Sequence, residues 1–150
     1  MHDHDTRPSE ALVQPNEPPA VEPLVSSFPA EFETHRTAAG EELDCKTFVP
    51  SGYDGTVDVP LVLMLHGCLQ TPDDFALGTR MNEIAERETF IAVYPKQPRD
   101  RNMTLCWNWF DDDQTTRGRG EAAMLDDLVG RHVEEYAIDT TRAFVAGLSA

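Results

Sequence analysis

Three short runs of consecutive apolar residues constrain the fold of this chain more than any other feature. They lie at residues 61–65, 90–94 and 143–146, and each has the length of a β-strand. A run without polar alternation is typical of a strand that is covered on both faces in a parallel sheet. Helical patterns separate the three runs. The order strand, helix, strand, helix, strand predicts an α/β fold with right-handed crossovers, a doubly wound, mostly parallel sheet and helices on both faces.

Both helical stretches carry recognisable signals. The first begins at Thr71-Pro72-Asp73-Asp74, where a threonine cap, a proline at the first helical position and early acids predict a helix start. We expect this helix to continue to about Glu88. The second begins at Glu121, and its apolar stripe consists of Leu125, Leu128, Val129, His132, Val133 and Tyr136. A further strand is expected at residues 43–49, before the first apolar run.

The charge of the chain excludes two classes of partner. It has 27 acidic and 12 basic side chains, which give a formal net charge of −15. Nucleic acids and anionic membrane surfaces are bound through basic residues, so we expect neither as a partner. No apolar run approaches the ~20 residues that a membrane-spanning helix needs.

The amino-terminal residues differ in composition from the rest. Six of the 11 prolines lie in the first 30 residues, without sustained periodicity. Such a segment buries too little apolar surface to offset its ordering entropy. We therefore expect a disordered acidic arm over residues 1–35 and a domain over residues 36–150. The arm lacks the features of a signal peptide. Its His-Asp alternation lacks further ligands, so we expect no metal site.

The last strand run is followed by Gly147-Leu148-Ser149-Ala150. This is four-fifths of Gly-x-Ser-x-Gly, the sharp strand-to-helix turn that lifts a nucleophilic serine above the edge of a sheet. An ordinary turn can have the same four residues. The position of this sequence directly after a strand favours the nucleophile turn. The pattern therefore predicts Ser149 as a catalytic nucleophile.

A second motif, His66-Gly67-Cys68, directly follows the strand at residues 61–65. In α/β-hydrolases the oxyanion hole takes one backbone N–H from such a loop and one from the residue after the serine. Here these would be the amides of Cys68 and Ala150. Gly67 lets the backbone turn its N–H toward the substrate. We expect His66 to support this loop through its backbone rather than to act as the base.

Five motifs in order carry a resemblance to a known family. They are Leu65-His66-Gly67-Cys68, Thr71-Pro72-Asp73-Asp74-Phe75, Tyr94-Pro95, Cys106-Trp107-Asn108-Trp109-Phe110 and Gly147-Leu148-Ser149-Ala150. Over residues 40–150 the chain resembles the esterase family of poly(3-hydroxybutyrate) depolymerases, which also includes feruloyl and acetylxylan esterases. The resemblance implies an α/β-hydrolase fold, a Ser-Asp-His triad, no cofactor and an enzyme that is often secreted. The alternative location is the cytoplasm.

The resemblance also assigns roles to individual residues. It makes Ser149 the nucleophile of a carboxylic ester hydrolase that works through an acyl-enzyme, and it places Cys68 in the oxyanion loop. Trp107 and Trp109 either line the substrate cleft or anchor the long loop at residues 96–120. Cys68 and Cys106 both follow strands at their carboxyl ends, so a disulfide between them is expected if the protein is exported. The third cysteine, Cys45, is expected to be a free, buried thiol.

The sequence departs from the family pattern at its end. In this fold the triad acid and histidine follow the serine in the chain, and only Ala150 follows Ser149 here. We expect an inactive amino-terminal fragment, in which the strand at 143–146 exposes apolar surface and an unpaired edge. The alternatives are a non-catalytic binding or regulatory module, or a serine peptidase or acyltransferase of the same fold. The pattern leaves the ester open: polyhydroxyalkanoate, feruloyl, acetyl-sugar or short-chain.

Overall fold

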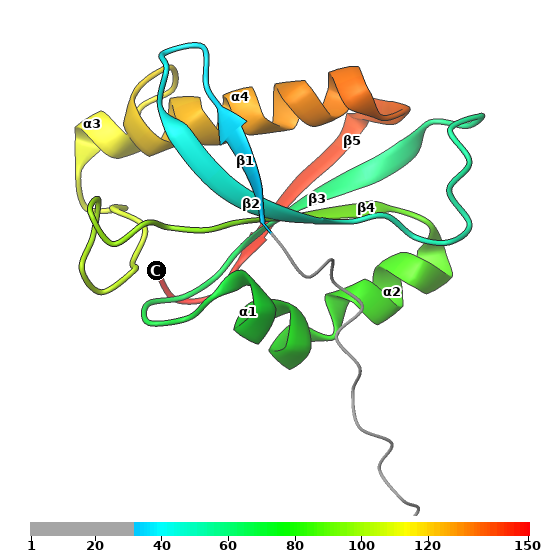
Figure 1. Cartoon of the computed structure of the whole chain (residues 1–150), viewed down its shortest axis with the longest axis horizontal. Helices are drawn as coiled ribbons and strands as arrows, with labels where there is room; N and C mark the ends of the chain where they lie inside the picture. The colour runs from blue at the N-terminus through cyan, green and yellow to red at the C-terminus, as the bar shows by residue number, and fades with distance from the viewer. Residues whose placement is uncertain (1–31) are drawn as a thin grey trace, which may run out of the picture.

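A five-stranded sheet between two layers of helices forms the part of the chain that the computed structural model describes, residues 32–150 (Figure 1). Residues 1–31 of the expected arm, including the His-Asp alternation, lie outside the described residues. The elements in chain order are β1 (Glu33–Arg36), β2 (Glu42–Phe48), β3 (Val59–Leu65), α1 (Pro72–Thr79), α2 (Met81–Glu88), β4 (Ile91–Pro95), α3 (Asp112–Thr115), α4 (Gly120–Glu135) and β5 (Ile138–Gly147).

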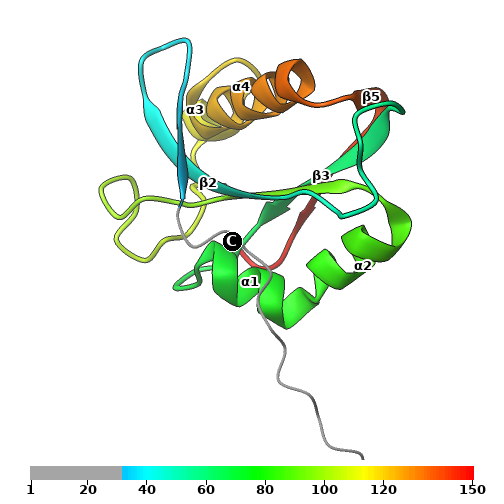
Figure 2. The ribbon, with the colours of Figure 1, turned by 45° about the vertical axis from the view of Figure 1, so that its right-hand side comes forward.

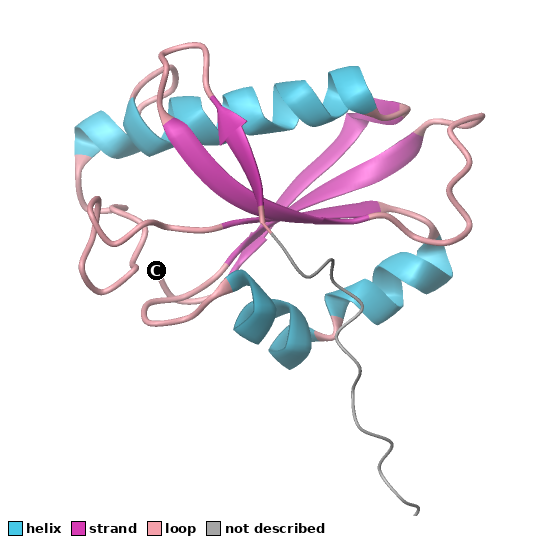
Figure 3. Ribbon diagram, in the orientation of Figure 1, coloured by secondary structure: helices cyan, strands magenta, loops and turns pink. Residues whose placement is uncertain are grey.

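The strand order places the carboxyl ends of three parallel strands at one edge. The order is β1-β2-β4-β3-β5, with β3 parallel to both β4 and β5, and β2 antiparallel to β1 and β4. Helices α1 and α2 cover one face of the sheet and α4 covers the other (Figure 3). The chain after β3 therefore leads to helices on one face of the sheet, and the chain after β4 leads to the helix on the other face.

The hydrophobic core has two parts, one on each face of the sheet. All five residues of β4 are buried, as predicted from the continuous apolar run. Met124 and Leu128 of α4 pack on one face, and Phe75 and Ala85 of the other helical layer pack on the opposite face. Each fully buried large side chain contributes roughly 1.5–3 kcal/mol by leaving water, so the two helical layers hold the sheet in place.

Helix α1 starts where the sequence predicts. The Thr71 hydroxyl accepts a hydrogen bond from the Asp74 amide at 3.2 Å, and the Asp74 carboxylate accepts one from the Thr71 amide at 2.9 Å. This reciprocal pair is a capping box. The neighbouring Asp73 accepts two bonds from the buried Lys46 ammonium at 2.8 Å, which ties the first turn of α1 to β2. The start of α1 is thereby fixed against the sheet.

The prediction of one continuous helix to Glu88 was wrong. Arg80 adopts a left-handed backbone conformation with φ of 54°, and this residue separates α1 from α2. The Thr79 hydroxyl donates to the Phe75 carbonyl at 2.7 Å, and such local bonds from threonine compete with the backbone ladder of a helix. Gly78 and Thr79 are also weak helix formers. The chain therefore bends here, and both short helices lie along the sheet.

Strand β1 lies at the start of the described residues and carries a buried histidine. β1 begins at Glu33, within the last residues of the segment that the sequence analysis assigns to the arm. His35 in this strand is 6% exposed. Its Nε2 lies 3.3 Å from the Asp127 carboxylate, which also accepts from the Ala38 amide at 2.8 Å. Four residues with a polar sequence give no apolar periodicity, so only their pairing with β2 makes them a strand.

Strand β5 is parallel to β3, as predicted, but it is not covered on both faces. Phe144 is 55% exposed and Val145 is 67% exposed. Among the described residues β5 has a paired neighbour only in β3, so its other edge is open. The expectation of a buried strand at 143–146 was wrong for these residues, whereas the expected exposed apolar edge is present.

Polar groups are buried between α4 and β2. His132 is 2% exposed, its Nδ1 donates to the Leu128 carbonyl at 2.8 Å, and its Nε2 accepts from the Thr47 hydroxyl at 2.9 Å. Burial lowers the pKa of His132, so the ring is held neutral. Cys45 is free and buried, as expected, and burial raises the pKa of its thiol to about 12.

The neutral His132 predicts a loss of stability in mild acid. Its pKa is lower in the folded chain than in the unfolded chain, so the unfolded chain takes up the proton first as the pH falls. The unfolding free energy should therefore fall below about pH 6.5, by at most about 1.4 kcal/mol per pH unit for this group. Urea unfolding at pH 7.5 and 5.5 measures the effect.

The variant His132→Gln should lose this part of the pH dependence. Between pH 7.5 and 8.5 the unfolding free energy should change with pH equally in the variant and the wild type. The His132 imidazole is neutral there in both the folded and the unfolded chain. Equal slopes between pH 7.5 and 5.5 in the two proteins would contradict the assignment.

Candidate active site

The turn after β5 has the backbone conformation of a nucleophile turn. Ser149 has φ of 63°, in the left-handed region that residues other than glycine rarely adopt. Such strain clusters at functional sites. At Gly147, an added Cβ would lie 3.3 Å from the Leu65 carbonyl oxygen, so glycine allows β5 to approach β3 closely. The turn is therefore both strained and tightly packed.

The loop after β3 packs directly on this turn. A Cβ added to Gly67 would lie 2.9 Å from the Leu148 carbonyl oxygen and 3.4 Å from the Ser149 Cβ. The Sγ of Cys68 lies 3.0 Å from the Ala150 carbonyl oxygen. Figures 1 and 2 both show the end of the chain beside this loop. The structure thus brings Gly67 and Cys68 next to Ser149 and Ala150, although the two pairs lie about 80 positions apart in the sequence.

The amides of Cys68 and Ala150, both at this junction, donate no hydrogen bond within the described residues. The Gly67 amide donates to Gln70 Oε1 at 2.8 Å, and the Leu69 amide donates to a carbonyl of the loop after β4 at 2.8 Å. The Cys68 amide between them donates no hydrogen bond within residues 32–150, and neither does the Ala150 amide. Unused N–H donors beside a strained serine turn are what the stabilisation of an oxyanion requires.

A disulfide joins the loops that follow β3 and β4. Cys68 and Cys106 are bonded, with their Cα atoms 4.2 Å apart, across 38 positions of sequence. Leu69 and Leu105, the neighbours of the two cysteines, have φ of 63° and 58°. The two loops are therefore held together covalently, with strained backbone on each side of the bond.

His66 supports the loop through its own backbone and through β4. The ring is 1% exposed, and its Nε2 accepts a hydrogen bond from the Gln97 amide at 3.2 Å. Nδ1 must then carry the proton, and it donates to the Gly67 carbonyl at 2.9 Å. Burial lowers the pKa of His66, which keeps the ring neutral. Its one lone pair is occupied, so His66 does not serve as a base for Ser149.

The two tryptophans occupy different environments. Trp107 is 7% exposed, its Nε1 donates to the His66 carbonyl at 3.1 Å, and its ring centroid lies 5.7 Å from that of His66. It anchors the long loop. Trp109 is 67% exposed and packs edge-on against Phe110 at 6.0 Å. Of the two rings, only that of Trp109 is presented to solvent.

Sequence reasoning missed three residues that hold these loops. Glu121 accepts hydrogen bonds from the side chains of Gln97 and Asn108. An acid in the first turn of a helix is an ordinary start signal, so Glu121 looked no different from Asp73. The only hint for Gln97 was its position just after β4, at the edge where the strands end. Their contacts arise from tertiary packing and leave no local pattern.

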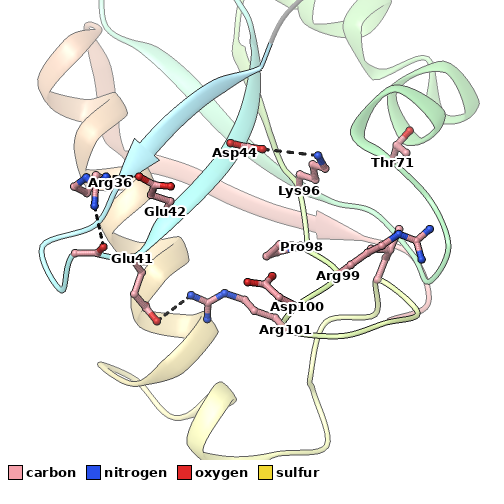
Figure 4. A pocket seen from close by; sticks show the side chains of 12 residues that line it. Arg36, Glu41, Glu42, Asp44, Thr71, Lys96, Pro98, Arg99, Asp100 and Arg101 are labelled. Carbon is pink, nitrogen blue, oxygen red and sulfur yellow. Dashed lines mark hydrogen bonds and ion pairs between the residues drawn. The ribbon is translucent and has the colours of Figure 1, made fainter.

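A pocket of about 880 Å³ opens between the β1–β2 hairpin and the loop after β4 (Figure 4). Ser149 does not line it. The ion pairs on its wall are Arg36 with Glu42, Arg101 with Glu41 at 2.9 Å, and Lys96 with Asp44 at 3.7 Å. Because Ser149 lies outside this pocket, we take the Ser149 junction as the candidate site.

Two kinds of feature are absent from residues 32–150. No group of three histidine, cysteine, aspartate or glutamate side chains in this range is arranged to hold a metal ion. No helix in it is long and apolar enough to cross a bilayer.

The known proteins that resemble this chain are described as depolymerases and esterases. The family described as esterase PHB depolymerase matches residues 44–150. Poly(3-hydroxyalkanoate) depolymerase C of Paucimonas lemoignei is 37% identical over 102 residues, which are 68% of this chain and 24% of that protein. Feruloyl esterase B of Neurospora crassa is 32% identical over 106 residues, which are 69% of this chain and 34% of that protein. The chain thus spans about a quarter to a third of these relatives.

Solved structures agree on the fold. A thermostable esterase has a TM-score of 0.59 at 21% identity, covering 81% of this chain and 34% of that chain. A poly(3-hydroxybutyrate) depolymerase of Bordetella parapertussis has a TM-score of 0.55 at 18% identity, covering 78% of this chain and 42% of that chain. The predicted α/β-hydrolase fold and the predicted family are both confirmed. The chain belongs to the esterase family of poly(3-hydroxybutyrate) depolymerases.

Proposed function

We propose that this chain carries the nucleophile and the oxyanion hole of a serine carboxylic ester hydrolase. Ser149 is the nucleophile, and the amides of Cys68 and Ala150 are the oxyanion donors. The observation that carries the proposal is the packing of the strained Ser149 turn on Gly67, beside two unused N–H groups. Relatives named as depolymerases and esterases support ester hydrolysis over peptide hydrolysis or acyl transfer.

The proposed reaction has two steps. The Ser149 oxygen bonds to the ester carbonyl carbon while a base takes the hydroxyl proton, and the carbonyl oxygen becomes an oxyanion that faces the Cys68 and Ala150 amides. The tetrahedral intermediate collapses, and the alcohol leaves with the proton. Water then attacks the acyl-enzyme by the same route and releases the acid. Loss of a single oxyanion donor costs roughly 10²–10³ in rate.

We further propose that these 150 residues do not turn over esters by themselves. Within residues 32–150 the Ser149 hydroxyl makes no hydrogen bond to a histidine. The three described histidines have other partners: His35 with Asp127, His66 with Gln97 and Gly67, and His132 with Thr47 and Leu128. A serine without a base is a poor nucleophile. The triad acid and histidine would come from additional chain, in line with the greater length of the relatives.

The proposed substrate is an ester with an apolar or aromatic part. The exposed Trp109–Phe110 pair offers an aromatic surface on the loop that the disulfide joins to the oxyanion loop. The relatives' names include polyhydroxyalkanoate, feruloyl and acetylxylan esters. Comparing these three classes with a short-chain ester would identify the substrate. The Cys68–Cys106 disulfide supports an oxidising compartment, and therefore an exported enzyme.

Removing the Ser149 hydroxyl should abolish ester hydrolysis. In the protein expressed from the whole reading frame that contains this chain, Ser149→Ala should lower kcat for p-nitrophenyl butyrate by at least roughly 10³-fold, because the acyl-enzyme cannot form. Its melting temperature should be at least that of the wild type, since alanine removes no packing contact. The 150-residue chain should show no turnover above its own Ser149→Ala variant. Full activity in Ser149→Ala would refute the proposed nucleophile.

Adding a methyl group at Gly67 should disturb the oxyanion loop. The new Cβ of Gly67→Ala would meet the backbone carbonyl of Leu148 at 2.9 Å, so the loop must move away from Ser149. Because a displacement of about 1 Å costs on the order of 10²-fold in rate, kcat should fall by roughly 10- to 100-fold with little change in KM.

Gly78→Ala is the matched control for this variant. Gly78 lies in α1, and an added Cβ there meets nothing within 4 Å. This variant should keep its activity and gain about 0.5–1 kcal/mol of stability, because alanine loses less backbone entropy in a helix. Wild-type kcat in Gly67→Ala, or an equal loss in both variants, would contradict the packing argument.

A further inference from the structure

A buried carboxylate outside the Ser149 junction has hydrogen bonds but no ion pair within the part of the chain that the structure describes. Glu121 lies in the first turn of α4 and is 5% exposed. No lysine or arginine of residues 32–150 forms an ion pair with it. Its charge is instead met by hydrogen bonds and by the positive end of the helix. A buried charge is costly unless it is fully bonded, so its partners are fixed with it.

The first branch from Glu121 leads through Gln97 to His66. The Gln97 side-chain amide donates to the Glu121 carboxylate and, at 3.0 Å, to the Cys106 carbonyl. Gln97 is fully buried, and its Oε1 has no partner among the described residues, so the NH₂ contacts alone orient the side chain. Its backbone amide donates to His66 Nε2 at 3.2 Å. Glu121 therefore holds the group that holds His66.

The second branch leads through the loop after β4. Asn108 donates to Glu121 twice, from its backbone amide at 2.8 Å and from Nδ2 at 2.6 Å. The preceding residue, Trp107, donates from its indole to the His66 carbonyl at 3.1 Å. Both branches end on His66, one at the ring and one at the carbonyl. The peptide unit that leads into Gly67 and Cys68 is thus held from two sides.

We propose that Glu121 is a positioning residue that fixes the oxyanion loop through Gln97, Asn108, Trp107 and His66. The inference rests on the proposed function, because it takes the Cys68 amide as an oxyanion donor. The disulfide keeps the two loops together, but it does not fix the direction of the Cys68 N–H. The backbone on either side of Cys68 determines that direction. The bonds to His66 fix the amino-terminal side of that turn. Glu121 acts through this chain and does not contact the reacting atoms.

Glu121→Gln tests the proposal with little change in size. The carboxylate uses one oxygen for the Gln97 and Asn108 side chains and the other for the Asn108 amide. A glutamine has only one oxygen, so its NH₂ would face a donor. In the whole reading frame, kcat for p-nitrophenyl butyrate should fall by roughly 10- to 100-fold while KM changes by less than about threefold. The amide resonances of Gly67 and Cys68 should shift in NMR spectra.

Two control variants separate positioning from a general loss of stability. Glu134→Gln changes an exposed glutamate on the same helix and should leave kcat unchanged. Thr47→Val removes the bond to His132, which lies near the carboxyl end of α4 and away from Glu121 in its first turn, so it should lower the melting temperature without lowering kcat. If Glu121→Gln does not fold, Asn108→Ala is the milder variant, and it should show a smaller loss of kcat in the same direction.

The outcomes distinguish this inference from the proposed function. If Ser149→Ala is inactive but Glu121→Gln or Asn108→Ala keeps the wild-type kcat and the wild-type Gly67 and Cys68 resonances, the positioning role is refuted and the proposed function stands. An equal loss of kcat in Thr47→Val would reduce the role of Glu121 to stability and would also refute it. If Ser149→Ala keeps full activity, the proposed function fails first.

Discussion

The close approach of the loop after β3 to the turn after β5 is the constraint on which the site depends. It exists because β3 and β5 pair in parallel with Leu65 opposite Gly147, so both strands end at the same level. Only a residue without a side chain fits at Gly67, against the backbone of Leu148. A larger residue would separate the two segments. The sheet register and one glycine together bring the Ser149 turn against the loop that contains Gly67 and Cys68.

The surroundings of this junction keep it in place despite its strain. Three non-glycine residues near it, Leu69, Leu105 and Ser149, have left-handed backbones, each of which costs on the order of 1–3 kcal/mol. A disulfide, the buried His66 ring and the Glu121 hydrogen bonds oppose relaxation of that strain. Donors that are fixed before the substrate arrives need no reorganisation during the reaction, which is the main source of electrostatic catalysis.

The sequence predicted the features that local patterns encode. Continuous apolar runs located β3 and β4, and the threonine cap located the start of α1. It did not predict the break at Arg80. The Thr79 hydroxyl bonds to a backbone carbonyl of the helix, and threonine forms this bond in some helices and not in others, so the sequence alone does not reveal it. Strand β1 has too few apolar residues for periodicity. The Gln97–Glu121 contact joins the end of a strand to the start of a helix 24 positions later, so only the folded chain displays it.

A crystal structure of the whole-reading-frame protein after reaction with a p-nitrophenyl phosphonate ester tests the central claim most directly. The phosphonate mimics the tetrahedral intermediate. The account predicts phosphorus bonded to the Ser149 oxygen, with the phosphoryl oxygen about 2.7–3.1 Å from the amide nitrogens of Cys68 and Ala150. A phosphoryl oxygen that points away from both amides, or a phosphonate bonded to another residue, would contradict it.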